Sequence, residues 1–129
     1  MLLQNSCVPD ATVENVCPPI ERENRVLIQG LTADSRYVNY NVTDPEKLRQ
    51  LTDFANLRQT IVQPGLNNPS SVRVRAVFYH DYEQLGVFGL GDDFFYVTCK
   101  DRNGTRPASA GELFEFQQFM EAAAPTEKR

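Results

Sequence analysis

The chain has 129 residues, of which 41% are hydrophobic and 23% are charged, a balance that predicts one folded domain rather than a disordered chain. Seventeen acidic residues against thirteen lysines and arginines give a net charge of −4, and the densest basic pattern is only VRVR at residues 72–75, which argues against nucleic acid as a partner. The longest apolar runs are far shorter than the ~20 residues needed to cross a bilayer, so no membrane span is expected.

The first 24 residues show no periodicity and are rich in proline, asparagine and glutamate. They carry Cys7 and Cys17, and the third cysteine of the chain is Cys99. Because such a segment cannot order itself, we expect residues 1–24 to be extended and tied down by a disulfide that involves Cys17. The pairing stays open, since Cys7 could bond to Cys17 or either of them to Cys99.

The start of the chain, MLLQNSC, lacks the charged and apolar regions of a signal peptide. One alternative is a cytoplasmic protein with three free thiols. The other is a periplasmic or secreted protein whose leader, with a possible lipid anchor, has been removed. The cysteine-bearing first segment favours the second alternative because disulfides persist in oxidising compartments.

Two strands are predicted next, at residues 25–31 (RVLIQGL) and 36–42 (RYVNYNV), joined by the turn TADS. The chain then changes to helical periodicity. Thr43 and Glu46 match a capping box and Pro45 suits a first helical turn, so we expect an amphipathic helix from Asp44 to about Arg58.

The second half alternates between predicted strands and turns. A short strand at residues 60–63 precedes a longer one at 71–80, in which Val72, Val74, Ala76 and Phe78 face one way and Arg73, Arg75, Val77 and Tyr79 the other. Strands are expected at 84–89 and 93–99, followed by a loop at 100–107 (KDRNGTRP). Ser109 and Glu112 form a second capping box before a closing helix whose apolar face is Leu113, Phe116, Met120 and Ala123.

The resulting order is β-β-α-(β)-β-β-β-α. Short turns between neighbouring strands imply antiparallel pairing. We therefore predict an α+β fold in residues 25–124, a single antiparallel sheet with two amphipathic helices packed on one face and the other face partly open, followed by a polar tail at 125–129.

The stretch LGVFGLGDDFFYVTC at residues 85–99 is the part of the sequence that most resembles a chemical site. Its glycine spacing matches neither phosphate-binding motif, and Asp92 and Asp93 lack the alternating acids of a calcium loop. We interpret it as a hairpin bend in which Gly89 and Gly91 adopt positive φ. His80 is the only histidine and is expected at a solvated turn, so no catalytic residue, metal or cofactor is predicted.

With no chemical site predicted, exposed side chains are the remaining candidates for a function. Tyrosine and arginine dominate protein-binding hot spots, and several of these residues fall on predicted strands and turns. The hypothesis of another protein as partner places the contact at Arg73, Arg75, Tyr79, Asp81, Tyr82 and Asp92. The competing interpretation is that the aromatic residues are core and the arginines are solvated. The oligomeric state is left open.

The order and size of the predicted elements are similar to those of small periplasmic bacterial immunity and inhibitor proteins. The segments that carry this resemblance are DPEKLRQLTDFANLR, VRVRAVFYHD, VFGLGDDFFYVTC and the closing helix. The resemblance covers residues 26–123 and implies a non-enzymatic protein that blocks a secreted effector by occlusion. The resemblance does not assign a function to any individual residue of this sequence. Two alternatives remain. The first is a small ligand-binding protein or enzyme, which a deep apolar cavity with convergent polar groups between sheet and helices would favour. The second is a cytoplasmic regulatory domain, which free thiols would favour.

Overall fold

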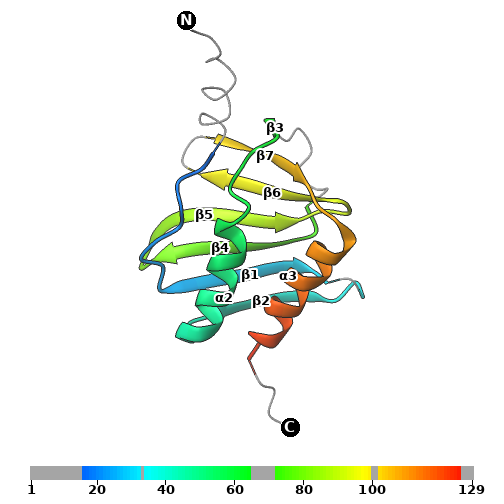
Figure 1. The fold of residues 1–129 in the computed structure, drawn as a ribbon. Helices are drawn as coiled ribbons and strands as arrows, with labels where there is room; N and C mark the ends of the chain where they lie inside the picture. The colour runs from blue at the N-terminus through cyan, green and yellow to red at the C-terminus, as the bar shows by residue number, and fades with distance from the viewer. Residues whose placement is uncertain (1–15, 33, 65–71, 100–101, 126–129) are drawn as a thin grey trace, which may run out of the picture.

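A computed structural model describes residues 16–32, 34–64, 72–99 and 102–125, which form one antiparallel seven-stranded sheet and two helices (Figure 1). Along the chain the elements are β1 (Arg25–Leu31), β2 (Tyr37–Val42), α2 (Pro45–Asn56), β3 (Gln63–Pro64), β4 (Val74–His80), β5 (Glu83–Leu90), β6 (Phe94–Cys99), β7 (Arg102–Pro107) and α3 (Ala110–Ala122). The strand order is β2-β1-β4-β5-β6-β7-β3. The predicted α+β fold is confirmed.

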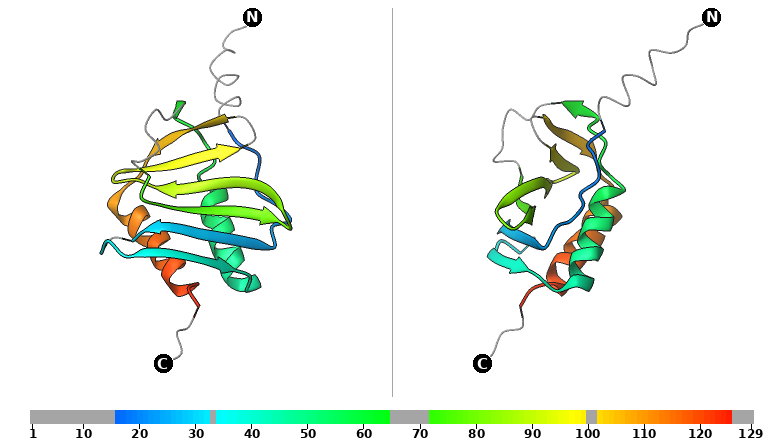
Figure 2. Two further views of the ribbon diagram at one scale, coloured as in Figure 1. Left: turned by 180° about the vertical axis from the view of Figure 1, so that it is seen from behind. Right: turned by 90° about the vertical axis from the view of Figure 1, so that its left-hand side faces the viewer.

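Both helices lie on the same face of the sheet (Figure 2). The second capping box is present, because Ser109 Oγ accepts from the Glu112 N–H at 3.1 Å and the Glu112 carboxylate accepts from the Ser109 N–H at 3.0 Å. The capping box predicted at Thr43 and Glu46 is wrong by one residue. The N-cap of α2 is Asp44 rather than Thr43, since its carboxylate accepts the free N–H of Lys47 and Pro45 opens the first turn.

Phenylalanines form the centre of the core between helices and sheet. Phe54 of α2 and Phe116 of α3 have ring centroids 5.0 Å apart, and both pack on Phe88 and Phe95 from the sheet. Phe116 and Met120 of the predicted α3 face are buried, while Leu113 and Ala123 pack against the core at its border. This face was predicted correctly.

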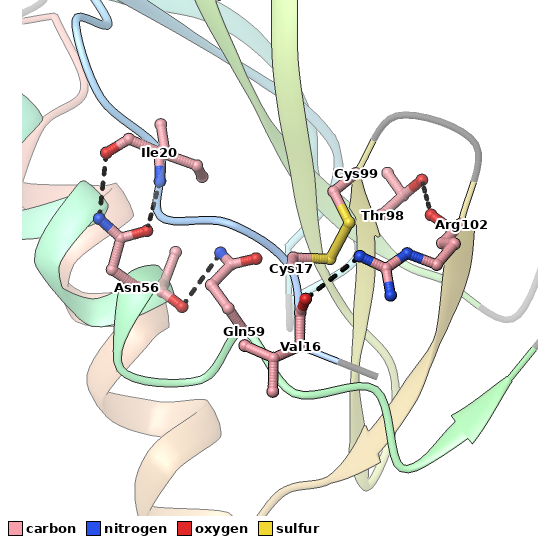
Figure 3. The surroundings of a disulfide bond; sticks show 9 residues. Val16, Cys17, Ile20, Asn56, Gln59, Thr98, Cys99 and Arg102 are labelled. Carbon is pink, nitrogen blue, oxygen red and sulfur yellow. Dashed lines mark hydrogen bonds between the residues drawn. A yellow bond between two sulfur atoms is a disulfide. The ribbon is translucent and has the colours of Figure 1, made fainter. Parts of the chain in front are cut away.

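The segment 16–24 closes one side of the core (Figure 3). Cys17 is 1% exposed and forms a disulfide with Cys99 at the end of β6, which resolves one of the pairings that the sequence left open. The Cys17 N–H donates to the Gln59 carbonyl at 2.8 Å, and Ile20 exchanges two hydrogen bonds with the Asn56 side chain. The tether at Cys17 is confirmed, whereas Cys7 lies outside the described residues.

Strand β7 corrects the expectation of a loop at residues 100–107. Its sequence, RNGTRP, contains the turn formers asparagine, glycine and proline, but the whole segment pairs with β6, and Gly104 pairs with Pro64 of β3. A Cβ at Gly104 would collide with the Ile61 side chain and the Gln63 carbonyl, so the close approach of β3 requires glycine here. Tertiary pairing thus overrides local turn propensity.

The glycines of the β5–β6 hairpin also differ from the prediction. Gly89 lies inside β5, and neither Gly89 nor Gly91 has a positive φ; of the described glycines, only Gly30 does, at +133°. A Cβ at Gly91 would overlap the Phe94 ring, so the glycine leaves room for that ring in its present position. The bend itself, between Leu90 and Phe94, is where the sequence placed it.

The face of the sheet opposite the helices is less open than its alternation suggested. Val77 is only 5% exposed and Val87 only 9%, although both belong to this face. Arg75 and Tyr37 of the same face are exposed. The centre of this face is therefore buried, and its exposed side chains include those along the edge strand β2 and Arg75 near the start of β4.

Candidate binding site

A cavity of about 280 Å³ lies between the sheet and α3, open to solvent on one side. Most of its wall is apolar. The apolar side chains that line it are Ile28, Leu31, Val38, Val74, Leu90, Leu113, Met120 and Ala124. It meets the description of a pocket between sheet and helices that the sequence left as an alternative.

Strand alternation directs Ile28 of β1 and the lining side chains of β2, β4 and β5 to the cavity. Ile28 pairs with Tyr40 of β2 on one side and with Ala76 of β4 on the other, so all three residues belong to the helix-facing side of the sheet. Leu113 and Met120 are seven residues apart on α3 and therefore share one helix face. The cavity is thus built from regular elements and not from loops alone, which favours a preformed site.

Polar groups surround the mouth of the cavity. Arg73 forms an ion pair with Asp92, with 3.3 Å between the guanidinium nitrogen and the carboxylate oxygen, and Arg36, Gln117 and Glu121 complete the polar rim. Two guanidinium groups and two carboxylates leave this rim without a net formal charge. The rim therefore favours an apolar, overall neutral occupant over a strongly charged one.

Tyr40 joins the sheet to the last turn of α3. Its hydroxyl donates to the Met120 carbonyl in the last turn of the helix at 2.6 Å. Burial, and then the nearby Glu121 carboxylate, raise the pKa of Tyr40 from 10.0 to about 12. The neutral, donating form of this side chain therefore holds α3 over the cavity.

Replacing Tyr40 by phenylalanine is expected to lower the free energy of unfolding by about 1 kcal/mol at neutral pH, because it removes this hydrogen bond. The pKa of Tyr40 is higher in the folded protein than its ordinary value of 10.0, so the contribution is complete below pH 10 and is lost as the pH rises toward 12. Urea denaturation over this pH range should therefore show the difference between Tyr40→Phe and wild type shrinking. Tyr82→Phe, at a side chain 96% exposed, is the control. A difference that is independent of pH would contradict this role.

The residues expected to bind a partner do not form one patch. Arg73 and Asp92 lie together at the rim of the cavity, where β4 begins and β5 ends. Tyr79, Asp81 and Tyr82 lie at the opposite end of the strands, around the β4–β5 turn. Arg75 stands between the two groups on the face opposite the helices and is exposed.

The β4–β5 turn is a structured corner. Asp81 has a φ of +54°; its carboxylate accepts from the Asn24 side chain and its N–H donates to that side chain, both at 2.9 Å. The Arg25 guanidinium lies 4.1 Å from the centre of the Tyr79 ring. His80 is at the strand end, as predicted, with its Nδ1 2.7 Å from the Arg22 carbonyl, so this nitrogen carries the proton. These contacts connect the turn to the segment before β1 and lie far from the cavity.

Within the described ranges, no three histidine, cysteine, aspartate or glutamate side chains gather closely enough to hold a metal ion. The same part of the chain contains no helix that is long and apolar enough to span a membrane. Sequence reasoning had missed most of the cavity wall. Leu113 and Met120 were assigned to the core, and nothing in their spacing indicates that the space beside them is unfilled.

Comparisons with known proteins return no match, whether with protein-family models, with curated proteins or with solved structures.

Proposed function

We propose that the chain is a non-enzymatic binding protein that receives an apolar side chain of another protein in the cavity under α3. The partner would be a secreted bacterial effector, which this protein blocks by occlusion in the periplasm. The single observation that carries the proposal is the cavity, with its apolar wall and its charge-balanced rim.

The size of the cavity supports a side chain as occupant. Its volume of about 280 Å³ exceeds the ~150 Å³ of a cavity that holds a benzene ring, so it has room for one large side chain. Leu31 lines the cavity and is 47% exposed, so apolar surface continues from the cavity to solvent. Aromatic and aliphatic anchors that enter such pockets carry most of the energy of protein–protein binding.

The Cys17–Cys99 disulfide is compatible with an oxidising compartment, and this supports the periplasmic or secreted location in the proposal. Both sulfur-bearing residues are buried, at 1% and 6% exposure, so a cellular reductant has poor access to the bond. Cytoplasmic residence with reduced cysteines is the competing location.

Filling the cavity tests the function. Gln117 lines the cavity and Gln118 is exposed next to it on α3, so Gln117→Trp blocks the site while Gln118→Trp is a matched control. Peptides selected from a random display library against the wild-type protein supply the probe. We expect Gln117→Trp to weaken their binding about tenfold or more, and Gln118→Trp to leave it unchanged. Equal affinities for the two variants would contradict the proposal.

A small ligand carrier is the second candidate, favoured by the same apolar wall. The neutral fluorophore N-phenylnaphthylamine is a suitable probe, because its emission rises on entry into an apolar site. A saturable signal that Gln117→Trp abolishes and Gln118→Trp preserves, together with no selected peptides, would favour the carrier over the protein-binding function.

A further inference from the structure

Strand β2 forms one edge of the sheet, and its hydrogen bonds to β1 follow a fixed alternation. The Leu31 N–H donates to the Arg73 carbonyl, and the Thr32 N–H donates to the Arg36 carbonyl, both at 2.8 Å. Odd-numbered residues of β1 therefore bond to β4 and even-numbered residues to β2. On β2 itself, the even-numbered residues bond to β1.

The consequence is that Tyr37, Asn39 and Asn41 turn their backbone N–H and C=O groups away from the sheet. In the described part of the chain, β2 has no neighbouring strand on that side. The side chains of these three residues are exposed as well, on the face opposite the helices. Together they present a row of backbone donors and acceptors at the spacing that a further strand would match.

The two edge strands of the sheet differ in how well they are protected against pairing with a further strand. The other edge, β3, has two residues, and one of them is Pro64, which cannot donate a hydrogen bond. β2 has six residues, YVNYNV, with no charged residue, proline or glycine. Edge strands are normally protected against pairing by charge, proline or shortness, and β2 has none of these devices.

The space beside β2 continues into the cavity. Val38 and Tyr40, on the helix-facing side of β2, are half-buried and line the cavity together with Met120 and Ala124 of the α3 end. Figures 1 and 2 show α2 and α3 both continuing past β2 on that side of the sheet. A strand added at β2 would lie beneath these helix ends, with every second side chain directed toward them.

We infer that an extended segment of the partner protein pairs with β2 as a further strand of the sheet and places one apolar side chain in the cavity. This inference rests on the proposed function and names the form of the partner. The segment has apolar side chains at alternate positions, no net charge and no proline where it must donate to β2. A second copy of this chain fits less well, because its own helices would enter the space that α2 and α3 already occupy beyond β2.

A pair of substitutions at Asn39 tests the contribution of backbone pairing separately from that of the side chain. The Asn39 N–H points away from β1, so Asn39→Pro removes an outward donor without removing a bond of the sheet, while Asn39→Ala removes the side chain and keeps the donor. The library peptides selected on the wild-type protein are titrated against both variants, after thermal unfolding has shown that each is folded. We expect Asn39→Ala to bind as wild type and Asn39→Pro to bind about tenfold more weakly or not at all.

Each other outcome overturns the inference in a recognisable way. Equal binding by wild type and Asn39→Pro, with binding lost in Gln117→Trp, would leave the cavity function standing and exclude strand pairing. If none of these variants changes binding, or if the library gives no binding peptide, both the cavity function and the strand pairing are overturned. A dimer that Asn39→Pro dissociates would assign the edge to a second copy.

Hydrogen exchange supplies a readout that needs no variant. In the free protein the amides of Tyr37, Asn39 and Asn41 should exchange rapidly, and those of Val38, Tyr40 and Val42 slowly. Saturation with a selected peptide should protect the first three amides. Bound peptide without added protection at these amides would contradict strand pairing.

Discussion

Replacing Phe116 by alanine is expected to lower the free energy of unfolding by about 3–5 kcal/mol, the usual range when a buried aromatic side chain is removed. Phe116 is fully buried and lies at the centre of the aromatic core, with its ring centroid 5.0 Å from Phe54 and 5.1 Å from Phe88. Its loss would leave a cavity that these rings can fill only in part. Urea denaturation monitored by circular dichroism measures the change.

The matched control is two residues away on the same helix. Phe114 is 65% exposed, so Phe114→Ala should change the free energy of unfolding by no more than about 0.5 kcal/mol. Similar effects of the two substitutions, or a small effect of Phe116→Ala, would mean that α3 presents another face to the sheet.

Removal of the disulfide should have an effect of the same order. The bond joins residues 82 positions apart, and a closed loop of that length is expected to stabilise the folded state by about 4 kcal/mol, because it restricts the unfolded chain. The double variant Cys17→Ala/Cys99→Ala should therefore unfold at a markedly lower urea concentration. It should also expose the hydrogen bonds that segment 16–24 makes with Asn56 and Gln59 to solvent exchange, because the tether no longer holds them.

Intact mass measured after alkylation, with and without prior reduction, provides the control for the bonding state. Cys17 and Cys99 should be alkylated only after reduction and unfolding, because both are buried. Equal stability of the double variant and the wild type would show that the disulfide does not hold segment 16–24 in place.

The elements that the sequence predicted well are those whose local pattern and tertiary role agree. The alternation of β1 and β4 and the periodicity of α2 and α3 each identify a buried face, and the capping box at Ser109 marks the first turn of α3. β7 was missed because its Asn103-Gly104 pair and Pro107 are turn signals. Only the close approach of β3 and Ile61 gives Gly104 a place inside a strand.

The candidate site was predicted only in part for a related reason. Residue types identified Arg73 and Asp92 as surface residues of interest, and these two do lie together at the cavity rim. The cavity itself depends on how far α3 stands from β1 and β2, and no local pattern encodes that distance. The free edge of β2 likewise follows from the strand order, which the sequence did not specify.

Chemical-shift mapping by nuclear magnetic resonance tests the central claim most directly. The ¹⁵N-labelled protein is titrated with a library-selected peptide, and the backbone amide shifts are followed. Binding in the cavity predicts that the largest changes fall on Val38, Tyr40, Leu113 and Met120, with no change around Arg75 and Tyr79. Changes confined to Arg75, Tyr79 and the β4–β5 turn, with the cavity residues unaffected, would contradict it.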